Sequence, residues 1–230
     1  MNERYERQEM LPEIGKEGQQ KLRNTHVAVV GAGGLGCPVL LYLTAAGVGH
    51  ITIIDDDAVS LHNLQRQILY TEGDIYKPKA EVAAGRLSAL NNEVEVHPVC
   101  ERLCEANASR LIGRVDLIID CTDNLPARKV IDACAARIGV PWLYGSIGGW
   151  QGQCSLMNCG AEPKRYADLL LDEEPLMPAP AVLGALSGMV GSVQAAEAVK
   201  YLAGLSEEQL LTGKLWWMDL KTLRSGIFRF

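Results

Sequence analysis

The chain has 230 residues, enough for one large α/β domain, and its 48% hydrophobic content is sufficient for a buried core. A net charge of -6 and the absence of any basic block argue against a nucleic-acid partner. Seven cysteines, an odd number, favour a reducing compartment, so we expect a cytoplasmic protein.

Neither a signal peptide nor a membrane span is expected. The first ten residues, MNERYERQEM, are charged and contain no apolar stretch. The most apolar helix candidate, residues 181–203, carries Gln194, Glu197 and Lys200 along one side, which is not typical of a membrane-spanning helix.

The chain begins with a polar lead-in, residues 1–25, in which a helix is predicted over 13–22. Residues 26–57 then follow the pattern of a nucleotide-binding βαβ unit. An apolar run over 27–30 is followed by a glycine turn and by a helical stretch that starts near Leu35. A second apolar run, over 51–54, ends in three aspartates.

The glycine turn is the centre of this unit. Gly31, Gly33 and Gly36 match the G-x-G-x-x-G spacing, in which missing side chains let the backbone turn tightly beside a phosphate or ribose. The helix that starts there directs its free N–H groups at an anion. Asp55, 19 residues beyond Gly36, can accept hydrogen bonds from ribose hydroxyls. The pattern predicts a nucleotide site without naming the nucleotide. The alternative is a tight βα turn that binds nothing.

Strands and helices alternate through the rest of the nucleotide-binding half, residues 26–145. Helices are predicted over 77–90, 106–112 and 126–138, and strands over 94–99, 115–121 and 141–144. In residues 146–230 we expect a strand over 153–158, a polar crossover loop over 162–180, a helix from Ala181, and a hairpin of strands over 215–219 and 225–230. We therefore predict a single α/β domain over 1–230, a doubly wound, mostly parallel Rossmann-like sheet extended by C-terminal antiparallel strands.

Several polar motifs follow one another along the chain, and together they resemble the ThiF/MoeB/HesA family, the bacterial relatives of ubiquitin-activating enzymes. The matching motifs are residues 4–8 (RYERQ), the glycine loop 31–36, Asp55-x-Asp57, residues 63–67 (NLQRQ), Lys79, residues 121–124 (CTDN) and residues 191–198 (GSVQAAEA). The resemblance covers nearly the whole chain, and a set of linked motifs is far more specific than one glycine loop.

The resemblance implies an enzyme that uses ATP and Mg²⁺ to adenylate the C-terminal glycine of a small ubiquitin-like sulfur-carrier protein ending in Gly-Gly. Pyrophosphate is released, and the pathway is of the thiamin or molybdopterin type. The resemblance also implies a homodimer in which Arg7 reaches into the partner's site. The implied catalytic residues are Arg7, Arg66, Lys79 and Asp123, the last as the Mg²⁺ ligand. The implied nucleotide-binding residues are Gly31, Gly33, Gly34, Gly36, Asp55, Asn63, Gln67 and Asn124.

Each of these residues also has a plain structural interpretation. Lys79 alone is more typical of a residue that caps the end of a loop, and Asp123 could be the N-cap of the following helix. Asp56 and Asp57 could be solvated turn acids, and Arg7 a solvated surface charge. The ordered set, and not any single residue, favours the functional interpretation.

The chain departs from the family in two places. Many members bind structural zinc through two C-x-x-C pairs, but here Lys164 and Ala167 occupy the first pair's positions and no cysteine follows Cys159. We therefore predict no zinc site. Some members transfer sulfur through a cysteine in the crossover loop, where this chain has Met177. That difference leaves a covalent thioester or persulfide step open and does not affect adenylation.

Two other functions stay open from the sequence. A nicotinamide-dependent oxidoreductase would use the glycine loop and Asp55, but it would leave Asn63, Lys79 and Asp123 without roles. A non-catalytic adaptor would keep only the fold and the carrier-binding surface, and the intact cations and Asp123 argue against it.

Overall fold

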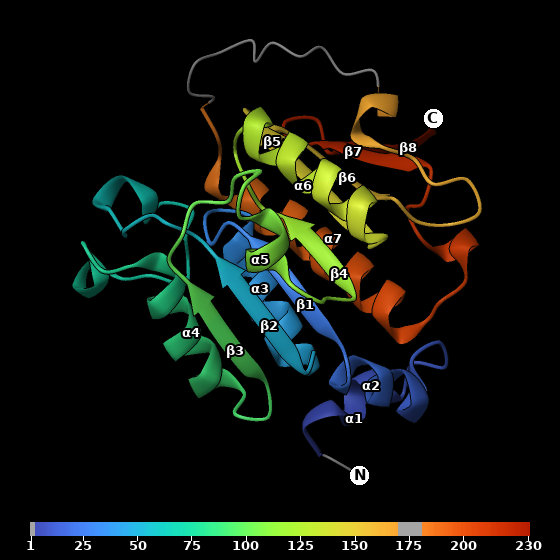
Figure 1. The fold of residues 1–230 in the computed structure, drawn as a ribbon, viewed down its shortest axis with the longest axis horizontal. Coiled ribbons are helices and arrows are strands. Elements are labelled where there is room, and N and C mark those ends of the chain that lie inside the picture. Colours follow the sequence, from blue (N-terminus) through green and yellow to red (C-terminus); the bar gives the residue numbers. More distant parts are fainter. Residues whose placement is uncertain (1–2, 170–180) are drawn as a thin grey trace.

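The computed structural model describes residues 3–169 and 181–230. The described residues form one eight-stranded sheet with helices on both faces (Figure 1). The strands are β1 His26–Val30, β2 His50–Ile54, β3 Glu95–Val99, β4 Leu117–Asp120, β5 Trp142–Gly148, β6 Gln151–Met157, β7 Lys214–Asp219 and β8 Arg224–Arg229. The helices are α1 Glu6–Glu9, α2 Gly15–Arg23, α3 Gly36–Ala46, α4 Lys79–Leu90, α5 Ala108–Ile112, α6 Leu125–Ile138 and α7 Gly184–Ala203.

The sheet runs in the order β3-β2-β1-β4-β5-β6-β7-β8. The first five strands are parallel, and β6, β7 and β8 continue the sheet in antiparallel fashion. The predicted doubly wound sheet with an antiparallel C-terminal extension is therefore confirmed. The strand order reverses between β1 and β4, because the chain returns from β3 at the edge to a place beside β1. Open α/β sheets bind ligands beyond the carboxyl ends of the strands at such a switch point.

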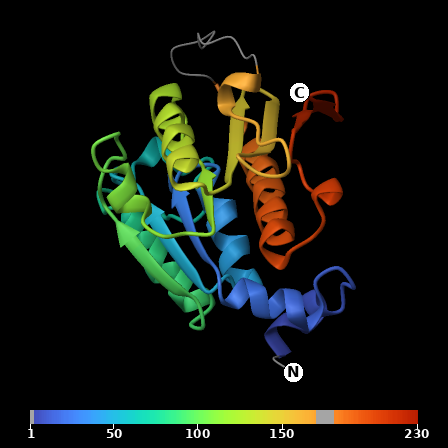
Figure 2. The ribbon, with the colours of Figure 1, turned by 45° about the vertical axis from the view of Figure 1, so that its right-hand side comes forward.

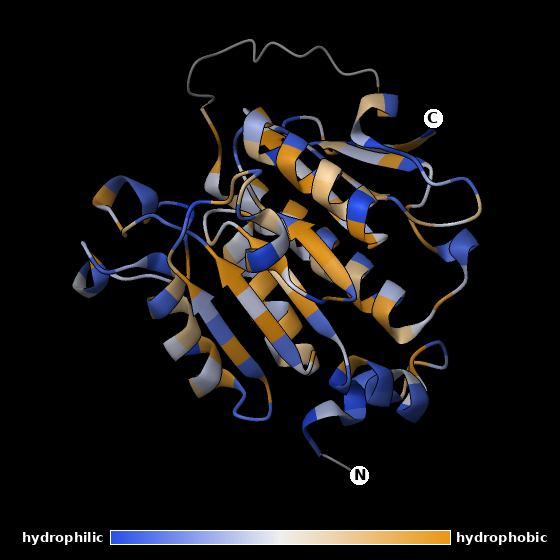
Figure 3. Cartoon of the chain, viewed as in Figure 1, coloured by the Kyte–Doolittle hydropathy of each residue, from blue (hydrophilic) through white to orange (hydrophobic). Residues whose placement is uncertain are grey.

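Two helical layers bury the two faces of the sheet (Figure 2). The core under α3, α4 and α7 includes Leu40, Leu87 and Val190. The core under α5 and α6 includes Ile112 and Ile131. Because β1, β2 and β4 lie between the two layers, their sequences are nearly continuous apolar runs. Figure 3 shows the hydrophobic residues along these central strands and the hydrophilic ones on α1 and α2.

The largest differences from the predicted elements concern β5 and α7. β5 was expected to end at Tyr144 and continues to Gly148, because it pairs with β6 along its whole length. The division between residues 145 and 146 thus falls inside a strand. α7 begins at Gly184 and not at Ala181, since Leu183 is still extended. Part of the predicted crossover loop, residues 170–180 with Met177, lies outside the described residues. In the part of the chain that is described, no helix is both long and apolar enough to cross a membrane.

The N-terminal lead-in packs at the end of the sheet where the parallel strands begin (Figure 1). The Tyr5 hydroxyl accepts a hydrogen bond from Asn91 Nδ2 at 2.8 Å, at the C-cap of α4. Gln8 and Gln19 donate to the carbonyl oxygen of Ala46, the last residue of α3, at 3.2 and 2.9 Å. The lead-in is therefore tied to the ends of α3 and α4 that are farthest from the glycine turn.

Candidate active site

The turn between β1 and α3 has glycine at two positions where no side chain fits. Gly31 has a φ of +97°, and a Cβ there would lie 2.6 Å from the carbonyl oxygen of Cys121. A Cβ on Gly36 would overlap the carbonyl oxygen of Gly31. The glycine turn therefore lies directly against the end of β4, and residues 31–36 and 121–124 meet at the switch point.

Asp55 holds the glycine turn from the end of β2. One of its carboxylate oxygens accepts the Ala32 N–H at 2.7 Å, and the other accepts the Asp57 N–H at 2.9 Å. Burial raises the pKa of Asp55 above its ordinary value, although the Lys79 ammonium and the two amides oppose that shift. Each carboxylate oxygen has a second lone pair. Asp55 can therefore accept a ribose hydroxyl while it fixes the turn.

Lys79 is buried next to the acidic end of β2. Lys79 is 4% exposed, and its Nζ lies 2.7 Å from Asp57 Oδ2. Asp56 pairs instead with Arg102 at 2.9 Å. Asp56 and Asp57 are both exposed to solvent, as the plain interpretation expected, and each also forms an ion pair. A buried ammonium needs a charged partner, and Asp57, whose side chain is 59% exposed, is the partner that holds Lys79 at the site.

Arg66 and Gln67 approach the glycine turn from the segment that follows β2. Gln67 is buried, its Nε2 lies 3.5 Å from where a Gly33 Cβ would be, and its Oε1 has no hydrogen-bond partner. Arg66 packs its Cδ against Gly34, and its Nη1 donates to the His62 carbonyl at 3.4 Å, near the outer limit for a hydrogen bond. Among the described residues no carboxylate forms an ion pair with Arg66. Its guanidinium is thus available to an anion.

The two predicted nucleotide-binding asparagines both make contacts within the fold. Asn63 Oδ1 accepts from the Ser60 N–H at 3.3 Å and from the Ser60 hydroxyl at 2.7 Å. Asn124 Oδ1 accepts the Ala127 N–H at 2.9 Å and caps α6. The alternative that Asp123 is this N-cap is therefore wrong. Asp123 is exposed, and its Oδ1 lies 3.4 Å from Asn124 Nδ2, so its carboxylate can take a cation.

A buried charge pair under loop 121–124 was not predicted from the sequence. Asp120 accepts the Thr122 N–H at 2.9 Å, the Thr122 hydroxyl at 2.6 Å and Arg128 Nε at 2.7 Å. Burial alone would lower the pKa of Arg128, but the Asp120 carboxylate raises it above its ordinary value. Arg128 lies one turn before Ile131 on the buried stripe of α6. An arginine on an apolar helix stripe is the sequence signal that could have revealed the pair.

Helix α7 contributes two polar side chains that also were not predicted as part of the site. Ser187 is fully buried, its Oγ has no hydrogen-bond partner, and it lies 2.9 Å from where a Gly34 Cβ would be. Gln194, also fully buried, donates from Nε2 to the Asp120 carbonyl at 2.9 Å. α7 therefore supports both the glycine turn and the end of β4.

Comparison with known proteins decides the family. The model of the ThiF family matches residues 5–230. The chain belongs to the ThiF family. A sulfur carrier protein adenylyltransferase of Thermus thermophilus is 40% identical over 229 residues, which cover 94% of this chain and 83% of that protein. A sulfur carrier protein ThiS adenylyltransferase of Escherichia coli is 39% identical over 231 residues, or 97% of this chain and 92% of that protein.

Solved structures show the same fold as this ThiF family member. Escherichia coli MccB with MccA-N7isoASN superposes with a TM-score of 0.88 at 21% identity, over 99% of this chain and 71% of that chain. MccB with ATP gives a TM-score of 0.86 at 22% identity, over 99% and 72% of the two chains. At these identities the likeness establishes the fold alone.

The predicted catalytic Arg7 does not reach the site of its own chain. Arg7 is exposed on α1, and α1 packs at the far end of α3 from the glycine turn (Figure 1). The 11 residues of α3 span about 16 Å. The role of Arg7 in a partner's site stays a prediction.

The cysteines closest to the glycine turn are buried thiols. Burial raises the pKa of Cys37 to about 12 and that of Cys121 well above its ordinary value. Because the thiolate is the reactive form, neither residue is a nucleophile at neutral pH. Residues 3–169 and 181–230 contain no group of three or more His, Cys, Asp or Glu side chains that could hold a metal ion. The absence of a zinc site stays a prediction.

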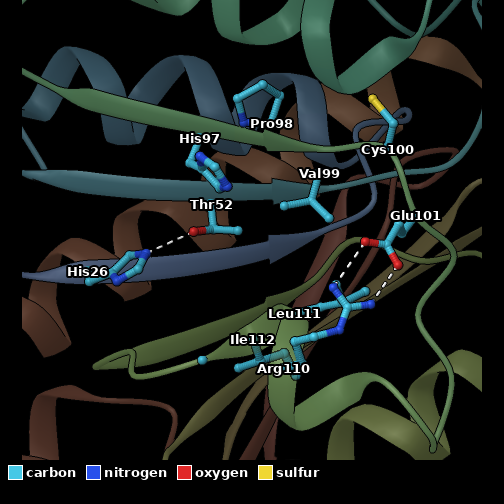
Figure 4. Close-up of a pocket in the computed structure, with 11 residues that line it drawn as sticks. His26, Thr52, His97, Pro98, Val99, Cys100, Glu101, Arg110, Leu111 and Ile112 are labelled. Atoms are coloured by element: carbon cyan, nitrogen blue, oxygen red, sulfur yellow. Dashed lines mark hydrogen bonds and ion pairs between the residues drawn. The ribbon is translucent and has the colours of Figure 1, made fainter.

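A cavity of about 460 Å³ lies away from these motifs, on the α5 side of the sheet (Figure 4). His26, Thr52 and His97 line it from β1, β2 and β3. His26 Nε2 and Thr52 Oγ1 are 2.8 Å apart, and Arg110 forms a double hydrogen bond with Glu101 at 3.1 and 2.7 Å. None of the residues predicted to bind the nucleotide lines this cavity.

Proposed function

We propose that this protein uses ATP to adenylate the C-terminal glycine of a small ubiquitin-like sulfur-carrier protein and releases pyrophosphate. The observation that carries the proposal is the set of charged groups at the switch point. Lys79 and Arg66 lie beside the glycine turn, and Asp123 follows β4 with an exposed carboxylate that forms no ion pair among the described residues. Two relatives near 40% identity are named sulfur carrier protein adenylyltransferases, which supports the same reaction here.

Adenylation needs no nucleophile from the protein. The carrier carboxylate attacks the α-phosphorus of ATP, the bond between the α-phosphorus and its bridging oxygen breaks, and pyrophosphate leaves. The protein must align two anions and offset the negative charge that develops on the phosphates. Lys79 and Arg66 supply positive charge, and Asp55 accepts the ribose hydroxyls. Mg²⁺ bound with ATP would neutralise further charge, and Asp123 is the residue that would hold it.

The C-terminal part of the sheet offers a surface for the carrier. α6 packs against β4 and β5, whereas on β7 and β8 the rings of Trp217 and Phe228 stack 6.0 Å apart, with Phe228 58% exposed. The Tyr144 hydroxyl and Gln153 Oε1, 3.2 Å apart, lie on β5 and β6, between these rings and β4. A Gly-Gly terminus has no side chains, so it can run along this surface and bring its carboxylate to the α-phosphate.

We infer a homodimer from the exposed apolar side chains. Tyr42 on α3 is 58% exposed and Met189 on α7 is 42% exposed, and these two helices pack side by side. Met10 and Leu11, directly after α1, are 67% and 51% exposed. Clusters of this kind mark protein interfaces. A two-fold dimer buries the same surface on both subunits, and it is the arrangement in which Arg7 of each chain can complete the other chain's site.

We also propose that residues 1–230 act as one unit, because the lead-in, the nucleotide-binding half and the C-terminal part each contribute to one reaction. The lead-in would supply Arg7, residues 26–145 the nucleotide site, and residues 146–230 the carrier surface. The seven cysteines are all free thiols, which supports a reducing, cytoplasmic compartment.

ATP–pyrophosphate exchange with a small carrier protein ending in Gly-Gly tests the proposed function. We expect exchange that requires both the carrier and Mg²⁺. The matched control is the same carrier without its last glycine, which should support no exchange because its carboxylate falls short of the α-phosphate. Calorimetry that shows tight NAD binding and no ATP binding would identify an oxidoreductase instead. Carrier binding without any exchange would identify a non-catalytic adaptor.

A further inference from the structure

Arg128 is a buried arginine that joins three parts of the molecule. Its side chain is 9% exposed, and its Nε donates to the fully buried Asp120 carboxylate at 2.7 Å. Its Nη2 donates to the Gly145 carbonyl on β5 at 3.2 Å and lies 3.4 Å from the Thr122 carbonyl. A guanidinium presents its donors in a fixed plane, so these contacts set the position of β4, β5 and loop 121–124 relative to one another.

The same contacts determine where Asp123 lies. The Asp120 carboxylate that Arg128 holds also accepts the Thr122 N–H and hydroxyl, at 2.9 and 2.6 Å. On the other side of Asp123, Asn124 is fixed as the N-cap of α6. Among the described residues, the Asp123 carboxylate accepts a side-chain hydrogen bond only from its neighbour Asn124. The place of its carboxylate is therefore set by the residues on both sides of it.

The start of the predicted crossover loop, at Tyr166, also packs against Arg128. The Arg128 guanidinium carbon lies 4.8 Å from the Tyr144 ring centroid and 5.6 Å from that of Tyr166, and these two rings are 5.6 Å apart. Arg165, the residue before Tyr166, is fixed to Asp132 of α6 by hydrogen bonds of 2.7, 3.0 and 3.1 Å. Tyr166 is thus held against the guanidinium.

We propose that Arg128 is a positioning residue for adenylation, which holds Asp123 in place through Asp120 and Thr122 and is itself held by Tyr166. The proposal rests on the proposed function, because it assigns Asp123 to the ATP-bound cation. A buried ion pair is weak evidence for stability, since apolar side chains of similar volume often serve as well. Its place directly under loop 121–124 gives the pair a geometric role instead. Substitution of residues that orient a cation ligand typically lowers activity or metal affinity about 10- to 100-fold.

The test compares Arg128→Lys with Arg137→Lys, a matched change in the same helix whose arginine contacts Ser109 and not the site. For Arg128→Lys we expect exchange kcat to fall about tenfold, and the Mg²⁺ concentration for half-maximal exchange to rise by a similar factor. We also expect faster hydrogen exchange of the Thr122 and Asp123 amides, measured by mass spectrometry on the protein without ATP. Arg137→Lys should resemble the wild type in all three measurements. Tyr166→Leu should change the same three quantities in the same direction, by less.

The outcome separates this inference from the proposed function. Arg128→Lys could lower the melting temperature and still match Arg137→Lys in pyrophosphate-exchange kinetics, in Mg²⁺ dependence and in amide hydrogen exchange. In that case Arg128 is merely structural and the proposal is wrong. Arg128→Met leaves the buried Asp120 carboxylate without its charged partner and is expected to unfold, so Tyr166→Leu provides the second test. If the wild type shows no pyrophosphate exchange at all, the proposed function fails. The amide-exchange comparison still decides whether Arg128 orders the loop.

Discussion

Two regions of the sheet carry clusters of polar side chains, and they differ in how those side chains are partnered. At the carboxyl ends of β1 and β4, Gln67 Oε1 and Ser187 Oγ have no partner, and Arg66 has no carboxylate among the described residues. On the α5 side of the sheet, over β1, β2 and β3, His26 is paired with Thr52, and Arg110 of α5 is paired with Glu101. The second region borders the cavity of about 460 Å³ shown in Figure 4.

The comparison indicates that partnering, and not empty volume, distinguishes the active site. A buried polar group without a partner costs about 1–3 kcal/mol, so a group of such side chains is typical of a place where a substrate completes the hydrogen bonds. Thr44 and Thr212 also have unpartnered hydroxyls, so one such atom is not enough. At the switch point they occur together with unpaired charge and a glycine turn that admits no side chain. The cavity lacks these features.

The largest expected effect is the loss of a cation at the switch point. Lys79→Ala and Arg66→Ala should each reduce ATP–pyrophosphate exchange about 10²-fold or more. Each substitution removes a positive charge that stabilises the negative charge developing on the phosphates. The matched control is Lys77→Ala, whose side chain is 58% exposed and pairs with Asp74 at 3.5 Å. It should retain near-normal exchange. Near-normal exchange in a folded Lys79 or Arg66 variant would remove that residue from the site.

The second prediction is that Arg7, which lies far from the glycine turn of its own chain, acts in the site of the partner subunit. Arg7→Ala and Asp123→Ala should each be nearly inactive as homodimers. In a mixed dimer one site has both defects and the other is whole. Random assembly makes half of the dimers mixed, so activity should recover to about a quarter of wild type. No recovery, with subunit exchange confirmed by tagged pull-down, would contradict a role for Arg7 in the partner's site.

Most of the fold could be predicted because its signals are local. The runs in β1, β2 and β4 are buried on both faces, and a continuous apolar run of that length indicates a parallel strand. The end of β5 has no such signal. Residues 145–148 have the sequence GSIG, and they form a strand because β6 pairs with them. Pairing between distant segments cannot be deduced from the composition of one of them.

Only those residues of the candidate site that belong to a sequence motif could be predicted. The motifs included Asp55, Arg66, Lys79 and Asp123, and the structure brings all four to the switch-point edge of the sheet. They did not distinguish Asn124 as a cap from Asn124 as a ligand, because both roles use the same Oδ1. They also could not include the residues beneath the loops, Arg128 and Ser187, whose burial depends on how α6 and α7 pack on the sheet.

A smaller effect is expected on ATP affinity when the pH is lowered and Asp55 becomes protonated. Because its pKa is raised in the folded protein, the folded state favours the protonated form, and the stability gained from that form declines as the pH rises through the folded pKa. Nucleotide binding has the opposite dependence, since the ionised carboxylate accepts the ribose hydroxyls. We expect calorimetry to show ATP affinity falling several-fold as the pH is lowered from neutrality toward this pKa. Asp55→Asn should bind weakly with a flatter profile, whereas Asp56→Asn should keep the wild-type profile. Identical profiles for the wild type and Asp55→Asn would show that Asp55 does not contact the nucleotide.

The smallest effect on pyrophosphate exchange is expected from substitutions of residues that line the cavity. His97→Ala should leave exchange within about twofold of wild type, because His97 is exposed and lies in the middle of the edge strand β3, not at the switch point between β1 and β4. Thr52→Ala should also keep its activity, but it removes the 2.8 Å hydrogen bond to His26. Its free energy of unfolding in urea should therefore fall by about 0.5–1.5 kcal/mol. Stability and activity are thus expected to separate in the cavity, whereas at Lys79 activity is lost while the protein stays folded. If His97→Ala or Thr52→Ala abolished exchange in a folded protein, the cavity would take part in the reaction, and partnering would not distinguish the two regions.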